Sequence, residues 1–130
     1  MSPPERFAHD DPREWMNRAR SNLARARLRV PEAYLEDLCF DAQQAAEKAI
    51  KAVMMSRGIE FPYTHDIAHL LGVLSVDGLT VGDSVLRATR LTPFAVHTRY
   101  PGLDEPVEEP EYLDAVEIAE AVVRWAEGLL

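Results

Sequence analysis

The chain has 130 residues, of which 47% are hydrophobic and 28% are charged, so it holds enough apolar material for the core of one domain and does not resemble a disordered chain. Its 14 Lys and Arg residues against 22 Asp and Glu residues give a formal net charge of −8, which disfavours a protein that coats nucleic acid with a basic surface. A single cysteine, Cys39, excludes an intrachain disulfide and a zinc site of four cysteines. The sequence shows no apolar run of transmembrane length and no apolar signal core near its start. We expect a soluble, cytoplasmic protein that has no membrane partner and forms one domain over residues 1–130, with residues 1–10 flexible.

The charge is distributed unevenly along the chain. Residues 1–30 contain seven arginines and four acids, whereas residues 101–130 contain nine acids and one base. We expect the arginines of the first helix to form a solvated face or to pair with the acidic C-terminal part, and not to form an RNA track, because no aromatic residues alternate with them. These arginines are Arg13, Arg18, Arg20, Arg25, Arg27 and Arg29. A local basic surface could still bind an anion.

The first helix is expected to begin after Asp11, which suits the N-cap, with Pro12 at the first helical position and Glu14 closing a capping box. Apolar residues at spacings of three and four then mark one helical face: Trp15, Ala19, Leu23, Ala26 and Val30. Pro31 ends this helix.

The second helix is expected over residues 31–57, with Gly58 as its C-cap. Its seam is rich in alanine, which favours helix and lets a neighbouring helix approach closely. The seam residues are Leu35, Leu38, Ala42, Ala45, Ala49 and Ala52 or Val53.

The rest of the chain also shows helical patterns. Thr64 is a plausible N-cap for a short helix that ends near residue 74, and residues 80–83 have the form of a capping box that opens a fourth helix. Pro93 predicts a kink or a break in that helix near residues 89–93.

Residues 101–110 are expected to form an exposed loop, and a last helix is expected over residues 110–130. The core residues of this helix are predicted to be Tyr112, Ala115, Val116, Ala119, Val122, Val123 and Ala126. The fold class is therefore all-α, an up-and-down bundle of four to five helices.

Three motifs, in this order along the chain, resemble landmarks of the HEPN domain. They are residues 40–52 (FDAQQAAEKAIKA), residues 62–67 (PYTHDI) and residues 99–101 (RYP). The resemblance implies a small helical bundle that forms a homodimer and is paired with a minimal nucleotidyltransferase in a toxin–antitoxin-like system. Active relatives are metal-independent endoribonucleases that carry an arginine, four to six residues and a histidine, and the two dimer copies form one cleft. Other relatives lack this motif and act as binding or partner modules.

Arg90 and His97 are the candidate catalytic residues, with six residues between them. On one ideal α-helix they would lie on the same face, roughly 10 Å apart. A histidine could take the proton of a ribose 2′-hydroxyl, and an arginine could stabilise the charge of the phosphorane. Two residues depart from the pattern of active relatives. Pro93 disturbs the helical phase between Arg90 and His97, and Leu91 stands where active relatives carry a polar residue. Alternatively, His97 flanks the kink and Arg90 is a solvated or salt-bridged side chain.

Arg99 and Tyr100 form a second candidate group, for binding a substrate or nucleotide or for modification. Arg99 could bind phosphate with two parallel hydrogen bonds. By the resemblance, Tyr100 could be the tyrosine that a partner nucleotidyltransferase modifies. We favour the alternative that Tyr100 and Pro101 pack against the end of the fourth helix.

The signature residues are interpreted as structural residues or dimer contacts, ahead of ligand binding. They are Gln43, Gln44, Glu47, Lys48, His65 and Asp66. Glu47 and Lys51 are four residues apart, a pair worth a few tenths of a kcal/mol if it is exposed. The backbone amides near Asp66 could receive an anion, and His65 with His69 could share a metal, but no third ligand has a suitable spacing. We expect no metal and no cofactor.

Two functional hypotheses follow. The first is a ribonuclease-type toxin that acts on RNA as a homodimer and is neutralised by a nucleotidyltransferase. The second is a catalytically silent module that binds a nucleotide or that partner. A purely structural bundle fits the periodicity equally well.

Overall fold

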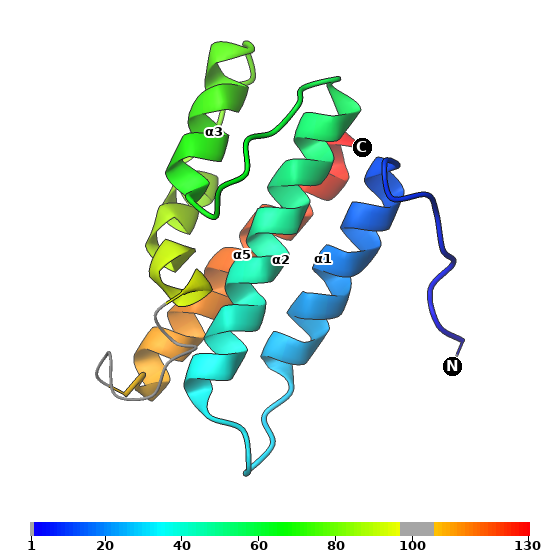
Figure 1. The fold of residues 1–130 in the computed structure, drawn as a ribbon. Helices are drawn as coiled ribbons and strands as arrows, with labels where there is room; N and C mark the ends of the chain where they lie inside the picture. Colours follow the sequence, from blue (N-terminus) through cyan, green and yellow to red (C-terminus); the bar gives the residue numbers. More distant parts are fainter. Residues whose placement is uncertain (1, 97–105) are drawn as a thin grey trace.

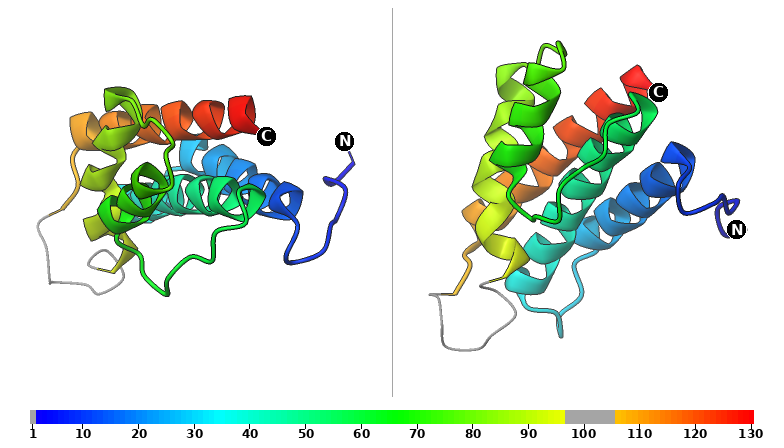
Figure 2. Two further views of the ribbon diagram at one scale, coloured as in Figure 1. Left: turned by 90° about the horizontal axis from the view of Figure 1, so that it is seen from above. Right: turned by 45° about the horizontal axis from the view of Figure 1, so that its top comes forward.

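The computed structural model describes residues 2–96 and 106–130, which contain helices and no strand, so the predicted all-α class is confirmed. In chain order the helices are α1 (Pro12–Arg27), α2 (Leu35–Ser56), α3 (Ile67–Val76), α4 (Asp83–Leu86), the 3₁₀ helix η1 (Arg87–Ala95) and α5 (Glu109–Leu129). Helices α1 and α2 are antiparallel neighbours, and α5 crosses behind α2 (Figure 1). The view from above places α1 and α2 in one layer and α5 in another (Figure 2). No helix in the described part of the chain combines the length and apolar content that crossing a bilayer requires.

Helix α1 begins at the predicted cap, but the capping box does not form. The Asp11 carboxylate accepts the N–H of Arg13 at 2.9 Å, as an N-cap residue should. Glu14 instead accepts the N–H of Phe7 at 2.9 Å, because the N–H of Asp11 already donates to the carbonyl of Ala8. Glu14 thus connects the N-terminal arm to α1. The expected flexibility of residues 1–10 stays a prediction.

The connection between α1 and α2 is longer than expected. Helix α1 ends at Arg27, Leu28 is extended, and Val30 is exposed, so its predicted place on the apolar face is wrong. Helix α2 begins at Leu35 and not at Pro31. A proline disfavours helical geometry in the residue before it, which explains why the two helices do not meet at Pro31. Gly58, at φ 71°, follows the C-cap of α2 in the left-handed conformation that glycine adopts without strain.

The fourth helical region differs from the prediction in its start and in its helix type. The N-cap of α4 is Gly82 with no side-chain hydrogen bond, so no capping box forms over residues 80–83. The α-helical geometry changes to 3₁₀ at Arg87, before the expected break at residues 89–93, and the 3₁₀ helix contains Pro93.

The core lies where α1, α2 and α5 meet. All the predicted core residues of α5 are buried, together with Ile118, and the helix begins one residue earlier than predicted, at Glu109. Five alanines on the inner face of α2 are fully buried: Ala42, Ala45, Ala46, Ala49 and Ala52. Their small side chains let neighbouring helices approach to about 8 Å. The buried hydroxyl of Tyr112 donates to the carbonyl of Ala26 at 2.6 Å, which satisfies a backbone acceptor near the end of α1.

Candidate functional site

The first candidate catalytic residue, Arg90, lies on η1 with its side chain 57% exposed. Its guanidinium Nη1 donates to Asp114 Oδ2 of α5 at 2.9 Å. Arg90 is therefore a salt-bridged side chain, as in the alternative interpretation. An exposed pair of this kind is worth about 0–1 kcal/mol, so the guanidinium could exchange the carboxylate for a phosphate at little cost.

The other candidate residues of this region, His97, Arg99 and Tyr100, lie outside the described residues. The prediction that Arg90 and His97 share one helical face assumed a single α-helix, and this assumption is wrong because η1 is a 3₁₀ helix that ends at Ala95. Leu91, the residue directly after Arg90, is buried in the core. This packing role explains why an apolar residue stands there.

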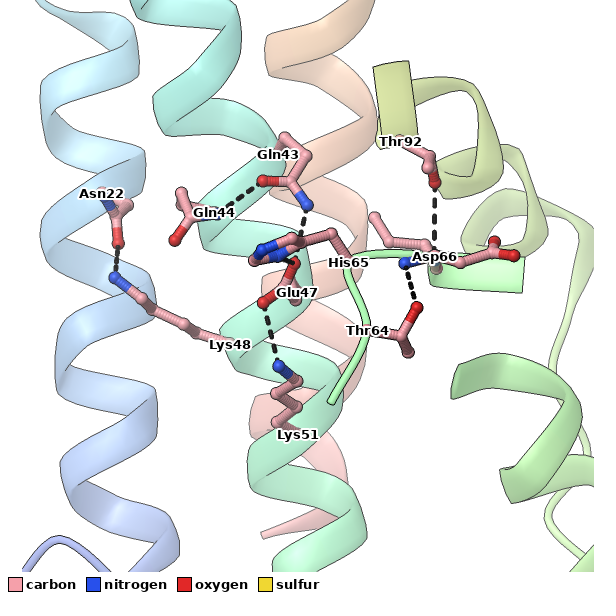
Figure 3. A network of polar contacts seen from close by, with 11 residues as sticks. Asn22, Gln43, Gln44, Glu47, Lys48, Lys51, Thr64, His65, Asp66 and Thr92 are labelled. Atoms are coloured by element: carbon pink, nitrogen blue, oxygen red, sulfur yellow. Dashed lines mark hydrogen bonds and ion pairs between the residues drawn. The ribbon is translucent and has the colours of Figure 1, made fainter. Parts of the chain in front are cut away.

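The signature residues of α2 form a hydrogen-bonded network around Glu47 (Figure 3). Gln43 Nε2 donates to Glu47 Oε1 at 2.8 Å, and Lys51 Nζ donates to Oε2 at 3.0 Å. His65 Nδ1 lies 2.9 Å from Oε1, and Gln44 Nε2 donates to Gln43 Oε1 at 2.7 Å. The interpretation of these residues as structural is consistent with this geometry, because the Glu47 side chain is only 5% exposed.

The electrostatics of the network favour an ionised Glu47. Burial raises the pKa of this carboxyl, but the hydrogen bonds from Gln43, His65 and Lys51 lower it by more, so its pKa lies below the ordinary value. An ionised carboxylate only accepts hydrogen bonds, so His65 Nδ1 carries the proton in this contact. The His65 side chain is 53% exposed. The arrangement therefore fixes the orientation of an imidazole that solvent can reach.

The residues after His65 differ from the predicted helix start. The N-cap of α3 is Asp66, whose carboxylate accepts the N–H of Ala68 at 3.1 Å. Thr64, the predicted cap, accepts the N–H of Asp66 instead. The N–H of Ile67 donates to the hydroxyl of Thr92 on η1 at 3.2 Å. Side chains thus occupy these amides, and the suggestion that they receive an anion is wrong.

The suggested metal pair does not share a helix. His65 precedes the N-cap of α3, whereas His69 lies inside that helix, so the four-residue spacing does not place them on one face. Within residues 2–96 and 106–130, no group of three His, Cys, Asp or Glu side chains converges as metal ligands would.

Lys48, the remaining signature residue, contacts Asn22, which none of the sequence motifs includes. Asn22 of α1 is buried. Its Oδ1 accepts from Lys48 Nζ at 2.7 Å (Figure 3). Its Nδ2 donates to Asp41 Oδ1 at 3.0 Å. The signal was present in the sequence, because position 22 falls between Ala19 and Ala26 in the apolar stripe of α1. A polar residue in such a stripe indicates a buried hydrogen bond.

A shallow pocket of about 330 Å³ lies between the end of α1 and α5. Its lining residues are Arg27, Arg29, Tyr112, Leu113, Val116, Glu117 and Glu120. Arg27 pairs with Glu120, and Arg29 pairs with Glu109, so the prediction that arginines of the first helix pair with the acidic C-terminal part is confirmed at this position.

Two solved structures are similar to this chain over nearly its whole length. The crystal structure of TT1696 from Thermus thermophilus matches with a TM-score of 0.76 and 31% identity, covering 92% of this chain and 98% of that one. The crystal structure of ST0689, described as an archaeal HEPN homologue, matches with a TM-score of 0.64 and 31% identity, covering 91% and 96%. No curated protein matches the chain. The model of the HEPN domain family matches residues 12–129, from the first turn of α1 to the end of α5, and the chain therefore belongs to this family.

Proposed function

We propose that this protein is the toxin component of a HEPN/nucleotidyltransferase toxin–antitoxin-like pair and that its homodimer is a metal-independent endoribonuclease. The observation that carries the proposal is the position of Arg90 in a HEPN domain: on η1, more than half exposed, and held by a surface carboxylate. A guanidinium in this position can reach an anionic substrate without loss of core packing.

The proposed reaction uses the residues that RNA cleavage without a metal requires. His97 takes the proton of a 2′-hydroxyl, and the resulting oxygen attacks the neighbouring phosphorus while the bond to the 5′-oxygen breaks. Arg90 stabilises the extra negative charge of the phosphorane. The protonated histidine returns its proton to the leaving 5′-oxygen, so the products are a 2′,3′-cyclic phosphate and a 5′-hydroxyl.

The alternative is a catalytically silent HEPN module that binds a nucleotide or a nucleotidyltransferase. Two observations support it: Arg90 already has a carboxylate partner, and the residue after it is the buried Leu91. In this case Arg90 would contribute a surface ion pair and no chemistry.

Incubation of the purified protein with total RNA in the presence of EDTA distinguishes the two functions. We expect cleavage by the wild type and a loss of about 100-fold or more in His97→Ala and Arg90→Ala. Arg87→Ala is the matched control, because Arg87 lies on the same helix and pairs with Glu117 of α5. Cleavage unchanged in Arg90→Ala and His97→Ala would contradict the catalytic assignment. A wild-type protein that is inert at micromolar concentration would leave the silent module as the function.

The proposed partner is tested by co-expression with a nucleotidyltransferase encoded by a neighbouring gene. We expect the two proteins to copurify. Mass spectrometry of the complex incubated with ATP tests Tyr100: an added nucleotide in the wild type and not in Tyr100→Phe would make it the modified residue, and no added nucleotide would favour its packing role. Arg99→Ala should weaken phosphate binding without changing the oligomeric state. The absence of both copurification and modification would contradict the pairing.

A further inference from the structure

Three cations gather on the surface formed by α1 and α2. Arg18 and Arg25 lie four residues before and three residues after Asn22, so the three residues share one face of α1. Lys48 of α2 reaches across to Asn22 between them, with Nζ 2.7 Å from Oδ1. We call Arg18, Arg25 and Lys48 the basic cluster.

The carboxylates near the basic cluster are buried beneath it. Arg18 pairs with Glu14 and Arg25 pairs with Asp41; these carboxylate side chains are 6% and 8% exposed, while the two arginine side chains are more than half exposed. Glu14 also lies 3.9 Å from Arg6, a further exposed cation. Lys48 has no carboxylate within ion-pair distance among the described residues, and its hydrogen-bond partner is a neutral amide. The outer surface therefore presents positive charge.

The opposite side of the molecule is arranged differently. Each arginine that meets α5 pairs with a carboxylate that is itself open to solvent, and these pairs are Arg20–Glu127, Arg27–Glu120, Arg29–Glu109, Arg87–Glu117 and Arg90–Asp114. Such a surface presents both signs equally. Because α5 lies in the layer behind α1 and α2 (Figure 2), the excess of exposed positive charge faces away from the acidic helix.

The pKa of Lys48 is affected by the two arginines of the cluster. Burial lowers the pKa of its ammonium, the charges of Arg18 and Arg25 lower it further, and Glu47 and Asp41 act in the opposite direction. Arg18 and Arg25 are therefore each close enough to Lys48 to repel its charge, and an anion bound beside Lys48 would relieve this repulsion.

We propose that the basic cluster binds phosphate groups of the RNA backbone. For Arg18 and Arg25 this departs from the expectation that the arginines of the first helix do not bind RNA, because the carboxylates paired with these two are buried. Guanidinium and ammonium groups are the side chains that best match phosphate oxygens. A protein partner is less well matched, because none of the large exposed hydrophobic residues of the described chain lies on α1 or α2, and protein interfaces need an apolar centre. The proposal rests on RNA being the substrate of the proposed function. Because Arg90 pairs with Asp114 on the α5 side, the basic cluster would hold a part of the strand that is remote from the cleaved bond.

The test is the binding of a fluorescein-labelled 12-nucleotide oligouridylate, measured by anisotropy at several salt concentrations. Three neutralised phosphates give a logarithmic salt slope of about −2 for a single strand. We expect each of Arg18→Gln, Arg25→Gln and Lys48→Gln to weaken binding roughly fivefold at low salt and to make the slope less steep by about 0.7.

The matched control is the triple variant Arg20→Gln, Arg27→Gln and Arg29→Gln, which changes the net charge as much as the triple variant of the basic cluster but affects the α5 side. We expect it to retain binding. Arg18 and Arg25 cover buried carboxylates, so each variant is first checked by thermal melting. Lys48→Gln keeps both of those ion pairs and can still donate to Asn22, so it tests the proposal even if the arginine variants unfold.

Four results would overturn the proposal: no binding of the oligomer by the wild type, equal loss in the control triple variant, binding of uridine monophosphate as tight as that of the oligomer, or equal binding of a 12-residue polyglutamate peptide. His97→Ala removes the proposed base of cleavage but no member of the basic cluster, so it separates this proposal from the proposed function. Binding that depends on the basic cluster without cleavage by the wild type would support the cluster and contradict the nuclease. Cleavage with binding independent of the cluster would do the reverse.

Discussion

Replacement of Glu47 by alanine removes the acceptor shared by the donors of the α2 network. Lys51, whose side chain is 10% exposed, would then hold a buried ammonium without its carboxylate, and the fully buried amide of Gln43 would lose its acceptor. Removal of one partner of a buried ion pair costs about 3–5 kcal/mol. We expect Glu47→Ala to lower the free energy of unfolding by about 4 kcal/mol, a large fraction of the roughly 5–15 kcal/mol of an ordinary domain.

Urea denaturation followed by circular dichroism and tryptophan fluorescence measures this loss. Trp15 is a useful probe, because its ring contacts Phe61 edge-on at 5.3 Å, and Lys51 Nζ lies 5.1 Å from the centre of the same Phe61 ring. The double variant Glu47→Leu with Lys51→Met is the control, since removal of both charges should restore the part of the stability that the unpaired ammonium costs, while the loss at the Gln43 amide remains. A loss below about 1 kcal/mol in Glu47→Ala would refute the reasoning, because that is the value of an exposed pair.

The pH dependence gives a second measure of the same network. The pKa of Glu47 is lower in the folded protein than its ordinary value of 4.5, so its ionised form stabilises the fold. This contribution is fully present above the pKa of the unfolded chain and is lost as the pH falls through the lower, folded-state pKa. The difference in stability between the wild type and Glu47→Gln should therefore narrow below about pH 4.5. A constant difference from pH 7 to strongly acidic solution would contradict the assignment.

Three further predictions concern single contacts. Tyr112→Phe removes the donor to the buried carbonyl of Ala26 and should cost about 1–2 kcal/mol in urea denaturation; no change would mean that water replaces the hydroxyl. Asp66→Ala removes the cap of α3 and should cost about 1 kcal/mol, whereas Asp66→Asn, which can still accept the amide, should cost less. Burial, together with the charges of Glu111 and Glu36, raises the pKa of Cys39 to about 12. Its thiol should therefore react with a disulfide reagent at pH 8 only as fast as the protein unfolds, and reaction at the rate of a free thiol would contradict this.

The hydrophobic spacing predicted the three long helices because their buried faces are set by local sequence. The ends were predicted less well because they depend on contacts that are distant in sequence. Thr64 and Asp66 can both cap a helix, and α3 begins after Asp66. The N–H of Ile67 donates to the hydroxyl of Thr92, which lies 25 residues later in the chain. Nothing within a window around Thr64 contains this information.

The candidate site shows the same division. The four-residue spacing of Gln43, Glu47 and Lys51 predicts their contacts on α2. It predicts only the small stabilising free energy of an exposed pair, a few tenths of a kcal/mol. The structure buries the pair, because the segment after α2 returns over the helix and brings Phe61 to Lys51 and His65 to Glu47. His65 lies 18 positions from Glu47, so the four-residue spacing contains no information about this contact.

The distribution of exposed charge follows from which carboxylates are buried. A count along the sequence makes residues 1–30 basic and residues 101–130 acidic, and it treats every arginine of α1 alike. In the fold, Arg20 lies beside a glutamate that is 41% exposed, whereas Arg18 lies above one that is 6% exposed. An approaching phosphate meets the carboxylate as readily as the guanidinium at Arg20, but meets the guanidinium first at Arg18. A chain with a net charge of −8 can therefore present a positive surface without additional lysine or arginine, provided that the compensating acids lie beneath the cations.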